Sequence, residues 1–321
     1  MSNISSYLPL ITNKLRPKVL FFGMQSTFST PSLLTLLEQG IEVCGVVLPA
    51  SPMPGHETPP IQRRKQPEGR RIPLPLLTMS TQQSIVEIAW REQIPVWDVY
   101  RLSHKETYDV LVSYQPDIIC VACFSQRIPR SILDVPRSGC LNVHPSLLPA
   151  NRGPDPLFWT FREGQETTGV TIHAMSEGMD TGDILAQESI AVSDGISYEQ
   201  LESQCAQLGG KLLAETVWNV YTGSAIATPQ NEAKSYAHSF PTDEDLIVHA
   251  EEWDARRVYN FIRGTGHLYG LVTVYDHEKL YLVKNAISYS RNGRAIELYN
   301  DRDEQGIEVR CKTGYVILTL L

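Results

Sequence analysis

The stretch GCLNVHPSLLPANRG, residues 139–153, places an asparagine and a histidine at the point where an apolar run ends. Side chains on a strand alternate between its two faces, so Asn142 and His144 project to the same side if the strand continues through both. An amide N–H can stabilise a developing oxyanion, and an imidazole can donate or transfer a proton. We therefore predict that these two side chains share one site, although either alone could simply end a strand.

A carboxylate follows in the segment SEGMDTGD, where Asp180 lies in a predicted turn. A carboxylate beside an imidazole holds the ring in place and can take up a proton during a reaction. A single aspartate in a turn is also a common structural residue, because its side chain binds nearby backbone N–H groups. The residue type thus permits a catalytic role but does not establish one.

Strand and helix patterns alternate through the first two thirds of the chain. Strand candidates are 18–24, 42–49, 95–99 and 117–124, and helix candidates are 31–37, 81–91, 104–113 and 198–221. This alternation predicts an α/β domain with a mostly parallel sheet and helices on both faces. Ligands of such sheets bind at the carboxyl ends of the strands, which is where Asn142 and His144 fall.

The pattern changes after residue 237. A helix candidate at 252–263 is followed by short alternating segments separated by Gly, Asn and Asp, which predicts a small antiparallel β barrel or sandwich. We divide the chain into an N-terminal extension (1–16), a catalytic domain (17–222), a linker (223–236) and a β-barrel-like domain (237–321).

Composition limits the classes of function. The 321 residues are 42% hydrophobic, enough for two well-packed cores. The net charge of −8 has the wrong sign for a protein that coats nucleic acid. The apolar runs are far shorter than the roughly 20 residues of a membrane span, and the N-terminus lacks a secretory signal pattern. We expect a cytoplasmic protein.

The six cysteines fit reduced thiols. Cys120 and Cys123 have CxxC spacing, but they lie in an apolar run and no second pair follows at zinc-site spacing. We interpret them as core cysteines and expect no metal.

The segment 141–153 together with TGVTIHAMSEGMDTGDIL (168–185) resembles the folate-dependent formyltransferase family. The shared pattern is Asn-x-His, a SLLPxxxG loop and an Asp in a DTG turn, three elements in the family's order. The resemblance extends to 235–264, which is similar to the start of the C-terminal domain of methionyl-tRNA formyltransferases. It implies a Rossmann-like formyltransferase domain followed by a small OB-like β barrel.

The resemblance implies transfer of a formyl group from 10-formyltetrahydrofolate to an amine, through a tetrahedral intermediate that carries an oxyanion. Asn142 would donate to the formyl oxygen. His144, if protonated, would donate to the same oxygen or to the leaving folate nitrogen. Asp180 would hold the imidazole and relay the proton that the attacking amine loses.

For the folate, the resemblance points to two segments that bind mainly through their backbone: Ser125, Gln126, Arg127 and Ile128, and the turn residues Glu177 and Gly178. For the acceptor it points to the loop residues Ser146, Leu147, Leu148, Pro149, Arg152, Gly153 and Asp155. Ser125 stands where methionyl-tRNA formyltransferases usually carry Gly, and Ala150 and Asn151 replace an Arg and an aromatic residue. An acidic Asp155 near the acceptor would repel a phosphate-rich substrate.

The acceptor therefore stays open at this point. The basic segment QRRKQPEGRR (62–71) stands where the family inserts a tRNA-contacting loop, which favours initiator methionyl-tRNA. Its composition equally suits a solvated loop, and 237–321 contains 10 Lys plus Arg against 13 Asp plus Glu. The alternatives are a small amine, such as a nucleotide-linked amino sugar, and hydrolysis of 10-formyltetrahydrofolate to formate.

Overall fold

The computed structural model describes residues 15–52, 55, 57–67, 83–266, 268–292 and 306–321. The strands of the first domain are β1 (Lys18–Gly23), β2 (Glu42–Pro49), β3 (Ile61–Arg63), β4 (Val96–Val99), β5 (Ile118–Ala122), β6 (Cys140–His144), β7 (Thr167–Ala174) and β8 (Ile184–Ala191). Its helices are α1 (Ser29–Glu38), α2 (Ile85–Arg91), α3 (Lys105–Ser113), α4 (Arg130–Leu133), α5 (Pro156–Arg162) and α6 (Tyr198–Thr222).

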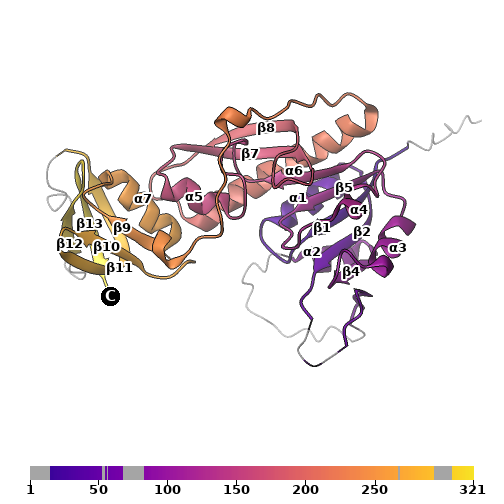
Figure 1. The fold of residues 1–321 in the computed structure, drawn as a ribbon, viewed down its shortest axis with the longest axis horizontal. Coiled ribbons are helices and arrows are strands. Elements are labelled where there is room, and N and C mark those ends of the chain that lie inside the picture. The colour runs from indigo at the N-terminus through magenta and orange to yellow at the C-terminus, as the bar shows by residue number, and fades with distance from the viewer. Residues whose placement is uncertain (1–14, 53–54, 56, 68–82, 267, 293–305) are drawn as a thin grey trace, which may run out of the picture.

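These strands form one eight-stranded sheet in the order β3-β4-β2-β1-β5-β6-β7-β8 (Figure 1). The five central strands, β4 to β6 in this order, are parallel, and β3, β7 and β8 add antiparallel pairs at the edges. Helices cover both faces: Val19 and Phe21 of β1 point into the core under α1 and α6, whereas Leu20 and Phe22 point into the core under α3 and α4. The prediction of a Rossmann-like, mostly parallel sheet is confirmed.

Helix α6 fixes the strands that carry the candidate site. A capping box at Ser197 and Gln200 begins the helix, and Gly223 ends it in the left-handed conformation. Between these ends the helix packs along β6, β7 and β8 and against α1. The helix ends where the proposed catalytic domain ends, at residue 222.

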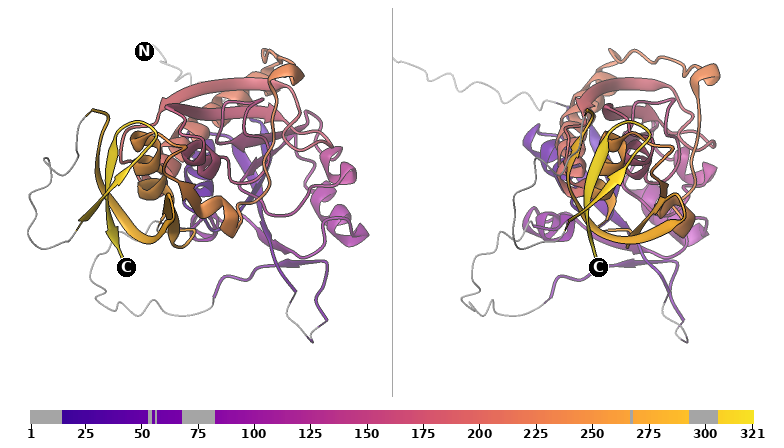
Figure 2. Two further views of the ribbon diagram at one scale, coloured as in Figure 1. Left: turned by 60° about the vertical axis from the view of Figure 1, so that its left-hand side comes forward. Right: turned by 90° about the vertical axis from the view of Figure 1, so that its left-hand side faces the viewer.

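The second domain contains a five-stranded sheet in the order β12-β13-β11-β10-β9, and it lies at one end of the molecule (Figures 1 and 2). Its elements are β9 (Ile247–His249), α7 (Ala255–Thr265), β10 (Val272–Asp276), β11 (Lys279–Ser290), β12 (Gly306–Arg310) and β13 (Tyr315–Leu320). The small β domain is confirmed, with one correction: β9 pairs with β10 in parallel, because α7 connects the two strands. The expected strand AIELYN (295–300) falls outside the described residues.

The segment expected to be a linker runs over the first domain and pairs with it. Thr228 exchanges backbone hydrogen bonds with Ile184 at the start of β8, and Ala237 forms a parallel bridge with Arg152. A short 3₁₀ turn at Glu232–Lys234 interrupts the segment, and another at Asp243–Leu246 follows it. The domain boundaries at 222 and 237 stay a prediction.

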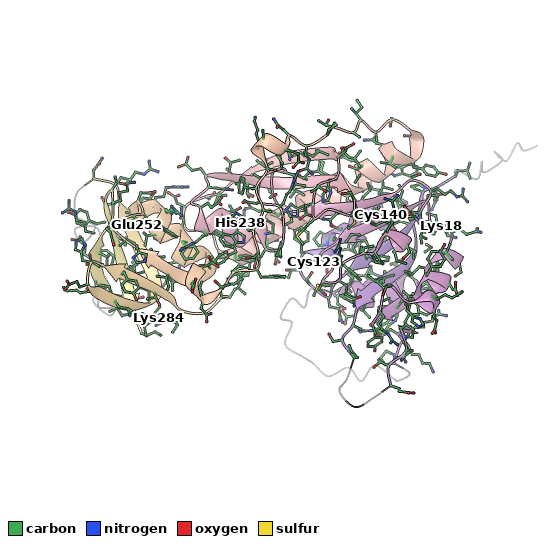
Figure 3. All side chains as sticks on the ribbon, in the orientation of Figure 1. Lys18, Cys123, Cys140, His238, Glu252 and Lys284 are labelled. Atoms are coloured by element: carbon green, nitrogen blue, oxygen red, sulfur yellow. The ribbon has the colours of Figure 1, made fainter. Side chains whose placement is uncertain are left out.

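An aromatic cluster joins the two domains. Phe158 of α5 is fully buried, with its ring centroid 5.7 Å from Phe261 of α7 and 4.9 Å from Tyr269. Nearby, Trp159 stacks on His238, with centroids 4.1 Å apart; Figure 3 labels His238 between the two domains. The core residues of both domains form one continuous cluster through these contacts.

The two cysteines with CxxC spacing differ in their exposure to solvent. Cys120 is buried as expected, but Cys123 is exposed, because β5 ends at Ala122 and the chain turns with a positive φ of 57° at Cys123 (Figure 3).

Within the basic segment 62–71, Arg64 forms a bidentate ion pair with Asp98 on β4. Arg70 and Arg71 lie outside the described residues. Among the described helices, none is both long and apolar enough to cross a membrane.

The aromatic cluster predicts that the domains unfold together. Phe158→Ala leaves a cavity that both domains line, so we expect it to lower the free energy of unfolding by about 3–5 kcal/mol. Urea denaturation followed by tryptophan fluorescence measures this loss. Phe240→Ala, at a side chain that is 72% exposed, is the control, and we expect a change within about 0.5 kcal/mol. Equal effects of the two substitutions would contradict a shared core.

Candidate active site

The pairing of β6 with β7 organises the candidate site. In this antiparallel pair, Asn142 lies opposite His173 and His144 lies opposite Thr171. The Asn142 amide nitrogen is 3.1 Å from His173 Nε2, and the rings of His144 and His173 are 6.3 Å apart, edge to face. The structure therefore brings Asn142 and His144 together at the carboxyl end of β6, and it adds a second histidine.

The carboxylate of Asp180 faces both histidines. Its Oδ2 lies 3.7 Å from His144 Nδ1, and its Oδ1 lies 3.5 Å from His173 Nε2. The Gly153 backbone N–H donates to Oδ2 at 2.8 Å, so the acceptor loop holds the same carboxylate. Asp180 adopts the left-handed conformation, with φ of 54°, which an aspartate tolerates better than most residues.

The surroundings of Asp180 and His144 determine the protonation states of these two side chains. Burial opposes ionisation of Asp180, but the positive charge of a protonated His144 and the hydrogen bond from the Gly153 N–H outweigh it and hold the pKa of this carboxyl well below its usual range. Burial lowers the pKa of His144 below 6.5, opposed mainly by the nearby Asp180 charge. Near neutral pH, the site thus holds an ionised carboxylate and a neutral His144.

The hydrogen bonds assign the tautomers of both rings. His144 Nε2 lies 2.8 Å from the carbonyl oxygen of Asn151, and a carbonyl only accepts, so Nε2 carries the proton. Nδ1 of His144 then presents its lone pair on the Asp180 side. The carbonyl of Ala174, 2.9 Å from His173 Nδ1, likewise assigns the proton to Nδ1. The Asn142 amide nitrogen can only donate, so the Nε2 of His173 accepts from it and orients the amide.

His173 was missed by the motif analysis. The segment TGVTIHA alternates polar and apolar residues, and Thr171 and His173 share one face of β7. That alternation was the available signal. The position of His173 in the site depends on how β7 pairs with β6, and the local sequence pattern does not specify that register.

The two expected folate segments lie together. The guanidinium of Arg127 donates to the Glu177 carbonyl at 3.3 Å, which joins the loop after β5 to the turn before Asp180. Ser125 and Gly178 are exposed, as a backbone-binding site requires. Gln126 donates its side-chain amide to the Val99 carbonyl at the end of β4, and Ile128 is buried in the core under α3 and α4. Binding of folate by the backbone of these two segments stays a prediction.

Most side chains of the acceptor loop have partners within the protein. Ser146 is buried and donates to the Ala150 carbonyl, and the Leu148 N–H donates to Thr171. Leu147 and Pro149 are half-buried. Arg152 is only 6% exposed, and its guanidinium binds Gln230 and Glu232 of the segment 223–236. Direct contact of these residues with an acceptor stays a prediction.

Gly153 is required by its surroundings. Its φ is +99°, and a Cβ there would overlap the carbonyl oxygen of His238, so only glycine fits between the loop and the segment that crosses it. Gly153 thereby allows its own N–H to reach Asp180.

Asp155 occupies a different environment from the one expected. Tyr198 of α6 donates to its Oδ1 at 2.8 Å, and Tyr269 of the second domain donates to its Oδ2. Burial and this carboxylate raise the pKa of both tyrosines, which keeps the hydroxyls protonated as donors. The charge of Asp155 is therefore engaged in a contact between the domains.

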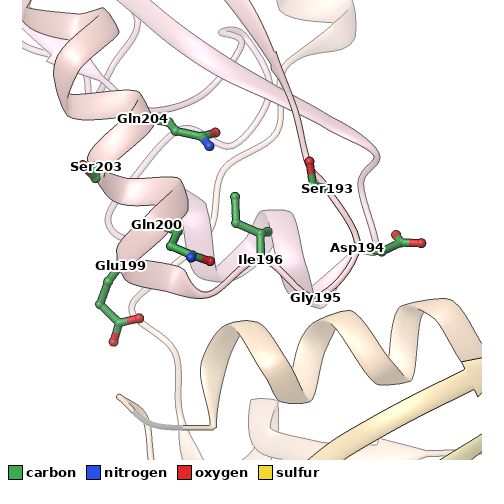
Figure 4. A pocket seen from close by; sticks show the side chains of 8 residues that line it. All are labelled: Ser193, Asp194, Gly195, Ile196, Glu199, Gln200, Ser203 and Gln204. Atoms are coloured by element: carbon green, nitrogen blue, oxygen red, sulfur yellow. The ribbon is translucent and has the colours of Figure 1, made fainter.

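A separate pocket lies between the loop 193–196 and the first turns of α6 (Figure 4). Its lining includes Asp194, Glu199, Gln200 and Gln204. Asp194 is already bound by Arg256 and Tyr289 of the second domain. This pocket contains none of the residues expected to bind folate or the acceptor.

The fold is Rossmann-like, and an amide, two imidazoles and a carboxylate gather at the carboxyl end of β6, a set of groups that suits a group transferase. Comparison with known proteins agrees. A family model described as formyl transferase matches residues 59–217. The methionyl-tRNA formyltransferase of Citrifermentans bemidjiense is 31% identical, over 95% of this chain and 88% of that protein. The corresponding enzyme of Syntrophus aciditrophicus is 33% identical, over 94% and 89%.

Solved structures support the fold. An N-formyltransferase from Helicobacter canadensis, in complex with folinic acid and dTDP-3-aminofucose, aligns with a TM-score of 0.63 at 15% identity, covering 95% of this chain and 99% of that one. HypX from Aquifex aeolicus, in complex with tetrahydrofolic acid, aligns at 0.52 and 18% identity, covering 94% of this chain and 43% of that one. The chain belongs to the formyltransferase family. It is a methionyl-tRNA formyltransferase-like enzyme whose formyl donor is 10-formyltetrahydrofolate, as the sequence predicted.

The charges of the site predict a pH dependence. Because the pKa of His144 is lowered, its imidazole is neutral above that pKa, and a role as proton acceptor is lost as the pH falls through it. Asp180→Asn removes the charge that raises this pKa, so the acid limb of kcat should move to lower pH. Single-turnover rates of both proteins, between about pH 5 and 8, measure the shift. The acceptor amine titrates identically with both proteins, so it does not cause a difference between their pH profiles. An unchanged limb would contradict the coupling.

Proposed function

We propose that this enzyme formylates the α-amino group of initiator methionyl-tRNA, and that Asn142, His144 and Asp180 carry the reaction. The observation that carries the proposal is the Asp180 carboxylate, only 14% exposed, which faces His144 at the carboxyl end of β6. Transfer to an amine requires stabilisation of an oxyanion and movement of one proton. These three side chains supply both.

Each side chain has a defined part. One N–H of the Asn142 amide binds His173, which leaves its second N–H to donate to the formyl oxygen. His144 is neutral, so its Nδ1 takes up the proton that the attacking amine loses, and the Asp180 charge stabilises the resulting imidazolium. The imidazolium then supplies a proton to the leaving folate nitrogen. The backbone of 125–128 and 177–178 holds the folate.

The acceptor is proposed from the relatives and from charge. The two bacterial relatives named above are methionyl-tRNA formyltransferases, and their match includes the second domain. In the basic segment, Arg63 and Lys65 are exposed, whereas the charge of Arg64 is neutralised by Asp98. Arg63 and Lys65 are therefore the described cations of this segment that are free to contact phosphates.

A nucleotide-linked amino sugar is the second candidate acceptor. It is favoured by the acidic balance of residues 237–321. The Helicobacter canadensis structure, which contains an amino sugar linked to dTDP, shares the fold at low identity. A compact acceptor of this kind would not need the basic segment.

The catalytic assignment predicts a large loss of turnover. His144→Ala and Asp180→Ala should each lower kcat by at least about a hundredfold, the usual scale for an acid–base group, with the affinity for folate nearly unchanged. The assay follows formylation of initiator methionyl-tRNA with 10-formyltetrahydrofolate, and formate release without acceptor reports hydrolysis. His104→Asn, at an exposed histidine that caps α3, is the control. Near-normal kcat in either active-site variant would refute the assignment.

The acceptor assignment predicts a salt-dependent effect of the basic segment. Replacing Arg63 and Lys65 with Ala should raise the KM for methionyl-tRNA by about tenfold and reduce the slope of log KM against log salt by about two. Lys105→Ala with Arg130→Ala removes the same charge from exposed ion pairs on α3 and α4 and is the control. Absence of tRNA formylation by the wild type, with formylation of a dTDP-linked amino sugar, would favour the second candidate.

A further inference from the structure

The side chain of Gln230, in the segment that connects the two domains, reaches the turn that carries Asp180. Its amide nitrogen donates to the carbonyl oxygens of Asp180 and of Gly182, each at 2.7 Å. Both N–H groups of one amide thus bind two carbonyls of the same turn. Gln230 is half-buried and comes from a segment 50 residues away along the chain.

Arg152 fixes the orientation of this amide. Its Nε and Nη2 donate to Gln230 Oε1 at 3.1 and 2.8 Å, and its Nη1 and Nη2 donate to the Glu232 carboxylate at 3.0 and 2.7 Å. A guanidinium has only donors, so the Gln230 oxygen must face it and the amide nitrogen must face the turn. The chain Glu232–Arg152–Gln230 therefore delivers two oriented N–H groups to the Asp180 turn.

The turn is closely enclosed by its neighbours, so its position depends on the contacts that hold it. Asp180 is left-handed, and a Cβ on Gly182 would overlap the carbonyl oxygen of Ala174, so the turn is pressed against the end of β7. The carboxylate itself has one direct backbone donor, Gly153, and two histidines at 3.5 and 3.7 Å. Release of the two carbonyls would let the turn relax and move the carboxylate away from His144.

We propose that Gln230 is a positioning residue for Asp180, and that the interdomain segment thereby sets the geometry of formyl transfer. The proposal rests on the catalytic role proposed for Asp180. It also gives Arg152 a part in the reaction, because Arg152 orients Gln230. The same segment continues to His238: the Tyr236 carbonyl accepts from the Arg152 N–H, and the His238 N–H donates to the Arg152 carbonyl, so movement of the second domain would reach Asp180 through it.

Gln230→Glu tests the proposal with a change of one group. The glutamate keeps an oxygen for Arg152 and gains charge attraction to it, so the segment stays anchored, but it replaces the N–H donors with an acceptor that repels the two carbonyls. A positioning role predicts that kcat falls by about tenfold to a hundredfold, with the KM for folate within about twofold of wild type and the melting temperature retained. Gln230→Ala should lower kcat similarly. Lys234→Ala, at an exposed side chain in the same segment, should leave kcat unchanged.

The pH profile separates positioning from simple anchoring. Asp180 and His173 are the titratable groups that face His144, and displacement of Asp180 weakens the only one that raises the His144 pKa. The acid limb of kcat in Gln230→Glu should therefore shift to lower pH, as in Asp180→Asn. Wild-type kcat and an unshifted limb in Gln230→Glu would overturn the proposal, even if Gln230→Ala fails to fold. An active Asp180→Ala, assayed alongside, would instead refute the catalytic role of Asp180.

Discussion

The site depends on one largely enclosed carboxylate, that of Asp180. A charge removed from water needs polar partners, and the groups that surround Asp180 come from segments far apart in the sequence. His144 comes from β6, His173 from β7 and the Gly153 N–H from the acceptor loop, while Gln230 of the interdomain segment binds the backbone of the same turn. The left-handed conformation of Asp180, the glycine at 153 and the burial of Arg152 all follow from this convergence.

The sheet supplies the fixed distances on which this arrangement relies. Strand β6 is the last parallel strand, and β7 returns antiparallel beside it, so the register alone places His173 opposite Asn142. Helix α6 holds both strands from one face. The second domain is part of the same framework, because Tyr269 binds Asp155 next to the acceptor loop and Phe158 packs between α5 and α7. Chemistry at the edge of one domain is thus supported by residues of the other.

Local sequence patterns predicted the sheet and the small β domain, because apolar runs and alternation report directly on burial. The two-residue spacing also predicted that Asn142 and His144 would lie together. Asp180 entered the site only through family resemblance, since no local pattern links it to His144. His173 was missed because its role depends on strand register, and Gln230 because a polar segment of linker composition gives no sign of where its side chains bind. Arg152 was expected at the acceptor, whereas its guanidinium binds the interdomain segment. Each of these features arises from long-range packing, which local periodicity does not encode.

The proposed path of the proton requires His144 to be neutral at neutral pH, with its proton on Nε2 and the lone pair of Nδ1 facing Asp180. ¹⁵N NMR of the protein labelled at its histidine rings, assigned by comparison with His144→Ala, measures both properties in one titration. We predict a protonated Nε2 and an unprotonated Nδ1 at pH 7, with a pKa below 6.5. An imidazolium at pH 7, or a neutral ring with its proton on Nδ1, would contradict the proposed path of the proton.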